Sequence, residues 1–201
     1  MIGCGYWGPN LLRNLMQNTR LEVVVLADQS AERRAFAQDR YPGLNCVEDA
    51  EDVLQNSDVE AVVIATPADT HGALVAAALE AGKDVFVEKP LSLSGEEASK
   101  LAAQAEELGR ILMVGHTFLF NEAVREVKRR IDGGELGNLH YLYSRRLNLG
   151  IVRSDVNAAW NLAPHDISIA CYLLDATPVS VNATGVRALQ PEAPHLEDVV
   201  F

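Results

Sequence analysis

The fold is decided by the stretch Gly3-Cys4-Gly5-Tyr6-Trp7-Gly8, which is followed by Pro9 and a leucine-rich segment. Its glycines have the G-x-G-x-x-G spacing of a turn that binds a dinucleotide. We expect Gly3 to permit a tight bend after a strand, Gly5 to let a pyrophosphate approach the backbone, and Gly8 to let the next helix pack close to the sheet. The free N–H groups at the start of that helix would then face the phosphates.

The sequence after this turn supports the same interpretation. Residues 22–28 predict a buried strand that ends in Asp28, whose carboxylate can accept hydrogen bonds from both hydroxyls of an adenosine ribose. An acid there would repel a ribose phosphate and so favours NAD, although Arg33 one helical turn later leaves NADP open. The alternative is that Asp28 only caps the helix that starts near Ser30.

Strands alternate with helices as far as residue 114. We expect strands at 22–28, 45–47, 59–65, 84–87 and 111–114, and helices at 31–40, 48–54, 71–81 (with Thr70 as its N-cap) and 94–108. Strands that are apolar on both faces indicate a parallel sheet covered by helices on both sides. In such a doubly wound α/β fold, ligands bind at the carboxyl ends of the strands. The residues that fall at such ends are Gly3, Asp28, Thr66 and Lys89.

The pattern changes near residue 115. A charged helix at 121–131, an antiparallel-type strand at 140–149, a helix from about 161 to 174, and strands at 178–188 and 196–201 predict an α+β unit with a largely antiparallel sheet. We therefore expect a dinucleotide-binding Rossmann domain at 1–118, and an incomplete α+β domain at 119–201. The sequence stops within a predicted strand, so we expect an unpaired sheet edge and poor stability of these residues alone.

Composition excludes several classes of protein. The net charge of -11 argues against nucleic acid as a partner, because a phosphate backbone would be repelled. No apolar run is long enough to span a membrane, and no signal peptide is visible. Cys4, Cys46 and Cys171 are odd in number and far apart, which is typical of reduced packing residues in a cytoplasmic protein and predicts no metal site.

Lys89 is the first candidate for chemistry. It follows a predicted strand and precedes Pro90, which restricts the backbone and thereby the direction of the lysine side chain. In a partly dry cleft, its ammonium could donate to a substrate hydroxyl and stabilise a developing alkoxide. The alternative is a surface lysine paired with Glu88.

The second candidate lies in residues 160–166. Asn161 and His165 are four residues apart, so a helix would place them on one face, and histidine is the usual proton acceptor near neutral pH. The alternative is a plain helix start, with Asn161 as the N-cap, Pro164 in the first turn and His165 in the core.

Together these motifs resemble the Gfo/Idh/MocA family, which includes glucose-fructose oxidoreductase and inositol dehydrogenase. The resemblance covers essentially the whole chain, and Glu88-Lys89-Pro90 is its most specific motif. It implies an NAD(P)-dependent oxidoreductase that transfers a hydride between the nicotinamide and a hydroxyl-bearing carbon of a sugar, sugar nucleotide or cyclitol. It also implies that the domain at 119–201 serves substrate binding and oligomerisation, and that the full-length protein is a homo-oligomer.

The resemblance also assigns roles to residues. Lys89 matches the family lysine that contacts the reacting hydroxyl, and His165 matches the acid/base histidine. Asn161 stands where many members have aspartate, so it can hydrogen-bond to substrate but cannot take a proton. The expected cofactor contacts are Gly3, Gly5, Tyr6, Trp7, Gly8, Asp28, Thr66, Pro67, His71 and Glu88.

Two questions about function remain open at the level of sequence. Arg146 and Arg153, in the second domain, could bind an acidic or phosphorylated part of the substrate, as sugar-nucleotide oxidoreductases would require. The alternatives to an enzyme are a non-catalytic NAD- and sugar-sensing regulator of the same fold, or an inactive fragment. Regulators can lose the lysine and the histidine, whereas this chain keeps both.

Overall fold

The computed structural model describes residues 1–147, 156–190, 192 and 196–201. The chain forms two compact units, Met1–Gly115 and His116–Phe201. Each unit is described by itself below.

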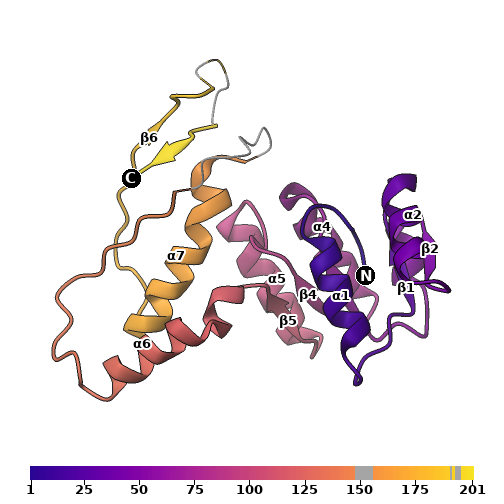
Figure 1. Ribbon diagram of the computed structural model, residues 1–201, viewed down its shortest axis with the longest axis horizontal. Coiled ribbons are helices and arrows are strands. Elements are labelled where there is room, and N and C mark those ends of the chain that lie inside the picture. Colours follow the sequence, from indigo (N-terminus) through magenta and orange to yellow (C-terminus); the bar gives the residue numbers. More distant parts are fainter. Residues whose placement is uncertain (148–155, 191, 193–195) are drawn as a thin grey trace. The chain divides into compact units, whose positions relative to one another are not determined.

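The first unit is built on a parallel sheet (Figure 1). Its strands are β1 Val25–Ala27, β2 Asn45–Val47, β3 Ala61–Ile64, β4 Asp84–Val87 and β5 Leu112–Val114. β1 pairs with β2, and β4 pairs with both β3 and β5, all in parallel. Ile2 forms parallel bridges to both Ala27 and Ile64, so the segment before Gly3 acts as a very short central strand. The order is therefore β2-β1-Ile2-β3-β4-β5, which is the doubly wound arrangement predicted from sequence.

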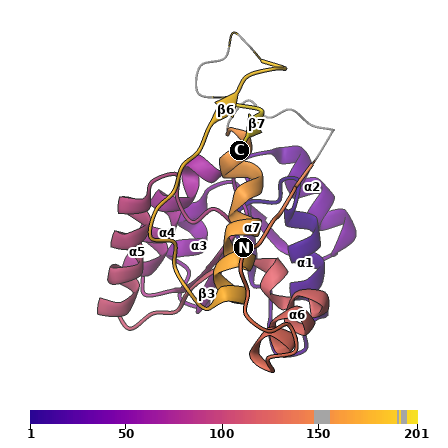
Figure 2. The ribbon, with the colours of Figure 1, turned by 90° about the vertical axis from the view of Figure 1, so that its left-hand side faces the viewer.

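Alternating side chains from the sheet feed two separate hydrophobic cores. One contains Ile2, Val25 and Ala27 and is covered by α3 Ala50–Leu54, α4 His71–Glu80 and α5 Gly95–Glu107. The other contains Met1 and Leu26 and is covered by α1 Gly8–Gln17 and α2 Ala31–Arg40. Figure 2 shows the two groups of helices on opposite sides of the strands. Neighbouring strand residues point to opposite faces, which explains why Leu26 and its two neighbours enter different cores.

Side-chain caps mark the starts of two of the five α-helices in this unit. The Ser30 hydroxyl accepts a hydrogen bond from Arg33 N before α2, and the Ser94 hydroxyl accepts one from Glu97 N before α5. Thr70 occupies the N-cap position of α4, as the sequence predicts, but its side chain makes no capping hydrogen bond. Thr70 ends a short 3-10 turn, Ala68–Thr70, and its hydroxyl donates to Pro67 O at 2.7 Å instead.

The second unit contains a helical pair and a small antiparallel ladder. Its elements are the 3-10 turn η2 Thr117–Phe120, α6 Glu122–Asp132, α7 Ala158–Leu174, β6 Gly185–Val186 and β7 Val199–Val200. The expected strands at 178–188 and 196–201 shorten to the two-residue pair β6 and β7. The strand expected at 140–149 is wrong for residues 140–147, which form no regular element, and residues 148–149 lie outside the described part.

Helix α7 starts earlier than the sequence predicts. Asn157 is its N-cap, and the Asn157 side chain accepts a hydrogen bond from Trp160 N at 3.1 Å. Asn161 is therefore inside the helix and is not its cap, and Pro164 also lies inside the helix. Among the described residues, none of the helices combines the length and the apolar character needed to cross a membrane.

Candidate functional site

The glycine turn leaves an open space beside the backbone. Gly3 has φ +87°, and a Cβ there would lie 2.7 Å from both Ala65 O and Thr66 Cγ2. A Cβ on Gly8 would lie 3.2 Å from Gly3 O, so the start of α1 packs tightly on the turn. By contrast, a Cβ on Gly5 would meet no atom within 4 Å. The backbone at Gly5 is therefore accessible to a ligand, as a diphosphate requires.

The start of α1 suits an anion. In the described part of the chain no side chain caps this helix, and its first turn holds no acidic residue. Pro9 occupies the second helical position, where a missing N–H has no consequence. Tyr6 and Trp7, which precede the helix, are 81% and 47% exposed. The turn thus presents uncapped N–H groups, with the positive end of the helix dipole, beside two aromatic side chains.

Asp28 ties the end of β1 to the glycine turn. Its Oδ2 accepts a hydrogen bond from Cys4 N at 2.7 Å, and its Oδ1 accepts one from Ser30 N at 2.8 Å. The cap of α2 is Ser30 and not Asp28, so the simple capping alternative is wrong. An ionised carboxylate has about four acceptor positions, so these two bonds leave capacity for the two hydroxyls of a ribose.

The loops after β3 and β4 lie side by side at the same edge of the sheet. Residues 63 and 64 of β3 pair with residues 86 and 87 of β4, so Thr66 and Lys89 follow neighbouring strand ends. His71, the first residue of α4, joins these loops because its ring nitrogens face Pro90 O and Thr66 O. Lys89 is half-buried, which does not favour a solvated surface lysine. The Lys89–Pro90 peptide bond is cis.

Glu88 places a carboxyl group in a tight setting next to Lys89. Its backbone N–H donates to Ile64 O at 3.0 Å, and a Cβ on Gly115 would lie 3.3 Å from its Cδ. Its Oε1 is buried and accepts no hydrogen bond from the described residues. Burial raises the pKa of Glu88 above its usual value, against the opposing effects of the Lys89 backbone N–H and the Lys89 charge.

In the second unit, α7 presents Asn161 and His165 one turn apart, as the spacing predicts. The His165 ring packs edge-on against Phe118 of η2, with ring centroids 4.8 Å apart. The Arg146 guanidinium also lies over the Phe118 ring, 4.6 Å from the ring centroid. Phe118 therefore links the candidate acid/base residue to the candidate substrate arginine.

Arg146 also forms an ion pair that sequence reasoning missed. Its Nε lies 2.5 Å from Asp166 Oδ2, and Ser144 Oγ donates to Asp166 Oδ1 at 2.6 Å. Burial acts to raise the pKa of Asp166, but the hydrogen bonds from Arg146 and Ser144 and the nearby charges outweigh it, so the pKa lies below its usual value. The only sequence signal was that Asp166 directly follows His165. Arg153, the other candidate arginine, lies outside the described residues.

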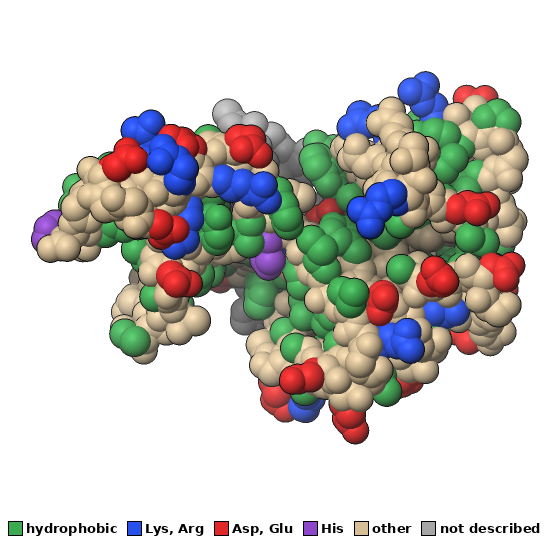
Figure 3. All heavy atoms as spheres, turned by 90° about the horizontal axis from the view of Figure 1, so that it is seen from below, with side chains coloured by type: hydrophobic (Ala, Val, Ile, Leu, Met, Phe, Trp, Pro, Cys, Tyr) green, Lys and Arg blue, Asp and Glu red, His purple; other side chains and the backbone are tan. Residues whose placement is uncertain are grey.

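The adjacent arginines at the end of α6 do not form a positive surface. Arg129 and Arg130 pair with Glu126 and Glu135 within α6 and just after it. The space-filling view of one face shows blue and red side chains interspersed (Figure 3). Such a surface does not favour a phosphate backbone, in line with the net charge.

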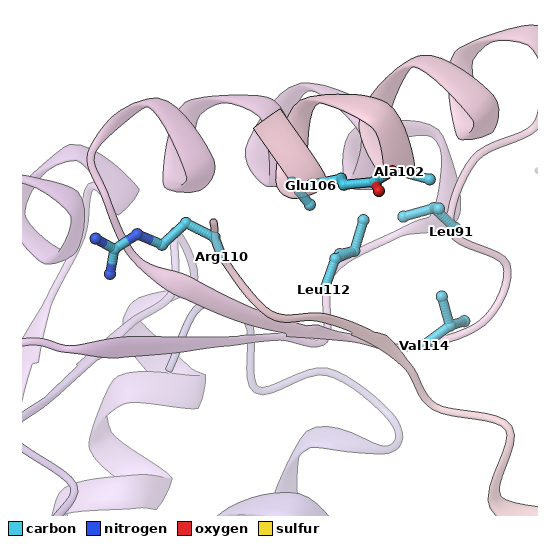
Figure 4. Close-up of a pocket in the computed structure, with 7 residues that line it drawn as sticks. Leu91, Ala102, Glu106, Arg110, Leu112 and Val114 are labelled. Atoms are coloured by element: carbon cyan, nitrogen blue, oxygen red, sulfur yellow. The ribbon is translucent and has the colours of Figure 1, made fainter. Parts of the chain in front are cut away.

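A shallow apolar groove of about 320 Å³ lies between α5 and β5. Leu91, Leu112 and Val114 face Ala102 across it, with Glu106 and Arg110 at one end (Figure 4).

The three cysteines are free thiols. In the described residues, no group of three or more His, Cys, Asp or Glu side chains is arranged to hold a metal ion.

Comparisons with known proteins agree with this geometry. Residues 1–116, more than half of the chain, match the Gfo/Idh/MocA family, described as an oxidoreductase family with an NAD-binding Rossmann fold. A curated relative is scyllo-inositol 2-dehydrogenase (NAD(+)) of Bacillus subtilis strain 168, which is 34% identical over 191 residues, covering 92% of this chain and 56% of the relative. The chain thus spans less than two thirds of the length of this enzyme.

Two solved structures extend the comparison. An NAD-binding protein from Listeria innocua superposes with a TM-score of 0.87 at 28% identity, covering 99% of this chain and 58% of the other. KijD10, a 3-ketoreductase from Actinomadura kijaniata in complex with NADP and TDP-benzene, gives a TM-score of 0.62 at 34% identity, covering 66% of this chain and 41% of the other. The glycine turn, the parallel sheet and the match over residues 1–116 agree, and the chain belongs to the Gfo/Idh/MocA family of NAD-binding oxidoreductases.

Proposed function

We propose that the chain forms the cofactor domain, and part of the substrate domain, of an NAD(P)-dependent dehydrogenase. The reaction would move a hydride between the nicotinamide and a hydroxyl-bearing carbon of a sugar, sugar nucleotide or cyclitol. The relatives support this substrate class, since one is named for scyllo-inositol and another was solved with a TDP derivative.

One observation carries the proposal, namely that Lys89 leaves the sheet at the same edge as the glycine turn and Asp28. The accessible backbone at Gly5 and the uncapped start of α1 would hold the diphosphate. Asp28 would accept hydrogen bonds from the adenosine ribose and so favour NAD over NADP. A ligand bound in this way would extend along the edge toward the loops after β3 and β4, where Thr66, Pro67 and Glu88 would line it.

The chemistry is divided between the bound cofactor and two side chains. When bound, the nicotinamide ring supplies the acceptor or donor of the hydride. The His165 imidazole would take the proton from the reacting hydroxyl, since histidine is the side chain best matched to this task near neutral pH. The Lys89 ammonium would donate a hydrogen bond to the same oxygen and stabilise the negative charge that develops on it.

Neighbouring residues of the second unit would orient the substrate. Asn161 would donate to or accept from a second hydroxyl but would not exchange protons, because an amide does not titrate. Arg146 is held by Asp166 and lies over Phe118, so its planar group would be presented in a fixed direction. Arg153 would bind an acidic or phosphorylated part of the substrate. The full-length protein would be a homo-oligomer, and light scattering of that protein tests the assembly.

Turnover with panels of cyclitols, sugars and sugar nucleotides, followed by NADH absorbance, tests the proposal. We expect Lys89→Ala and His165→Ala each to lower kcat by about 10²–10⁴-fold on the substrate that is turned over. Lys100→Ala and His140→Ala are matched controls at exposed positions and should change kcat less than twofold.

The outcomes separate the alternatives. Full turnover by both site variants would overturn the assigned roles. Tight binding of NAD with no hydride transfer from any member of the panels to the nicotinamide would instead favour a sensing regulator of the same fold.

A further inference from the structure

His71 occupies an unusual position for a histidine. It is 1% exposed, and both of its ring nitrogens face backbone carbonyl oxygens. Its Nδ1 lies 2.7 Å from Pro90 O, and its Nε2 lies 3.0 Å from Thr66 O. A carbonyl oxygen only accepts hydrogen bonds, so a neutral imidazole donates to one of these oxygens at a time and an imidazolium donates to both. In either state the ring offers almost no surface to a ligand.

The two carbonyl groups belong to the loops that carry the candidate site. The ladder between β3 and β4 ends with the hydrogen bond from Glu88 N to Ile64 O, 3.0 Å long. After that bond, the loop that follows β3 continues through Thr66 and Pro67, and the loop that follows β4 continues through Lys89 and Pro90. The His71 ring bridges the two loops just past the end of the ladder, at Thr66 O on one loop and at Pro90 O, directly after Lys89, on the other.

The segment after Pro90 is fixed from the other side. Ser92 is 4% exposed, and its hydroxyl donates to Glu97 Oε2 and accepts a hydrogen bond from Ser94 N at 2.9 Å. Gly72, directly after His71, has no side chain where the Glu97 carboxyl lies, since a Cβ there would be 2.5 Å from Glu97 Cδ. The first turn of α4 therefore anchors this segment at two points, one through His71 and one beside Gly72.

We propose that His71 is a positioning residue that acts through Lys89. By holding Pro90 O against the Thr66 loop, its ring sets the direction in which the Lys89 side chain leaves β4. This inference rests on the proposed function, because Lys89 is the group whose direction matters. The indirect role replaces the direct cofactor contact expected for His71, because the buried ring offers a ligand almost no surface. The effect on turnover can still be large, since a shift of about 1 Å in a catalytic group can change turnover by about 100-fold.

Single-contact variants separate the two hydrogen bonds. In His71→Asn the amide nitrogen takes the place of Nδ1 and keeps the bond to Pro90 O, whereas in His71→Gln it takes the place of Nε2 and keeps the bond to Thr66 O. We expect kcat to fall about 3-fold in His71→Asn and about 10- to 100-fold in His71→Gln and His71→Ala. The Kd for NAD should change less than about threefold in each variant.

A double-mutant cycle tests whether the effect passes through Lys89. In a Lys89→Ala background, His71→Gln should lower kcat less than twofold further, because no ammonium remains to be positioned. Val75→Ala, a fully buried position on the same helix, is the control for a general loss of stability and should leave kcat unchanged in both backgrounds. Multiplicative losses from His71→Gln and Lys89→Ala would overturn the proposal, as would a weaker Kd for NAD with unchanged kcat.

A spectroscopic measurement tests the inference without turnover. The chain has four lysines, so reductive methylation with 13C-formaldehyde gives few NMR signals, and Lys89→Arg assigns the relevant one. The Lys89 signal should move in His71→Gln and stay in place in Val75→Ala. An unmoved signal in His71→Gln would refute the positioning role. A moved signal, in a protein whose turnover survives Lys89→Ala, would refute the proposed function and leave the positioning of Lys89 intact.

Discussion

Gly3 and Gly5 should respond in opposite ways to the same added methyl group. In Gly3→Ala the Cβ must fit at φ +87°, 2.7 Å from Ala65 O, where an ordinary contact is at least 3.4 Å. The left-handed backbone costs about 1–2 kcal/mol, and displacing packed backbone by some tenths of an ångström costs about 1–3 kcal/mol. We therefore expect the free energy of unfolding to fall by about 2–5 kcal/mol, and Tm by roughly 10 °C or more.

Gly5→Ala meets neither obstacle. Its Cβ has no neighbour within 4 Å, so the free energy of unfolding should change by less than about 1 kcal/mol. The methyl group would, however, occupy the space through which a diphosphate approaches the backbone. We expect the Kd for NAD to rise at least about tenfold, or about 1.4 kcal/mol.

Two measurements check this pair of variants. Urea unfolding followed by circular dichroism gives the stabilities, and quenching of Trp7 fluorescence gives the Kd for NAD. Trp7 is 47% exposed beside the turn, and Trp160→Phe removes the only other tryptophan of the sequence. A Gly5→Ala protein that binds NAD like the parent, or a Gly3→Ala protein as stable as the parent, would refute the reasoning.

Two further predictions concern the carboxylates. Asp28→Asn should weaken the binding of NAD about tenfold relative to the binding of NADP, because the charge that repels a ribose phosphate is removed. The measurement is the ratio of the two Kd values, and an unchanged ratio would contradict the ribose role of Asp28. Asp166→Asn should lower the free energy of unfolding of the second unit by about 1–3 kcal/mol at pH 7, followed by Trp160 fluorescence in urea. Because the folded-state pKa of Asp166 is depressed, this difference is present above the ordinary value of 3.8 and should shrink as the pH falls below it; a constant difference down to pH 3 would contradict the ion pair with Arg146.

The first unit could be predicted from sequence because each of its elements is specified locally. Strands 45–47 and 84–87 and the helix at 31–40 have the bounds that the sequence predicts, since turn residues and caps mark their ends. The parallel order followed from strands that are apolar on both faces. Thr70 misled the capping argument because its hydroxyl bonds back to Pro67 O, a competition that Thr and Ser side chains often enter.

The second unit was harder to predict because its signals depend on partners distant in sequence. Residues 140–147 alternate like a strand but form none, since a strand needs a neighbour that shares its hydrogen bonds. For α7, the rule that proline belongs to a first turn placed the start near Asn161, whereas the helix begins at Ala158, directly after its cap Asn157. The ion pair of Arg146 with Asp166 joins positions 20 residues apart, and no local pattern announces it.

The division of the sheet between two cores has a consequence for how this chain can change. Leu26 contributes to one core while Val25 and Ala27 contribute to the other, and the hydrogen-bonded backbone separates them. Substitutions that repack α1 and α2 can therefore accumulate without compensating changes beneath α4 and α5. The two sides of this domain are free to diverge at different rates, so that adaptation around the adenosine end need not disturb the scaffold that supports Lys89.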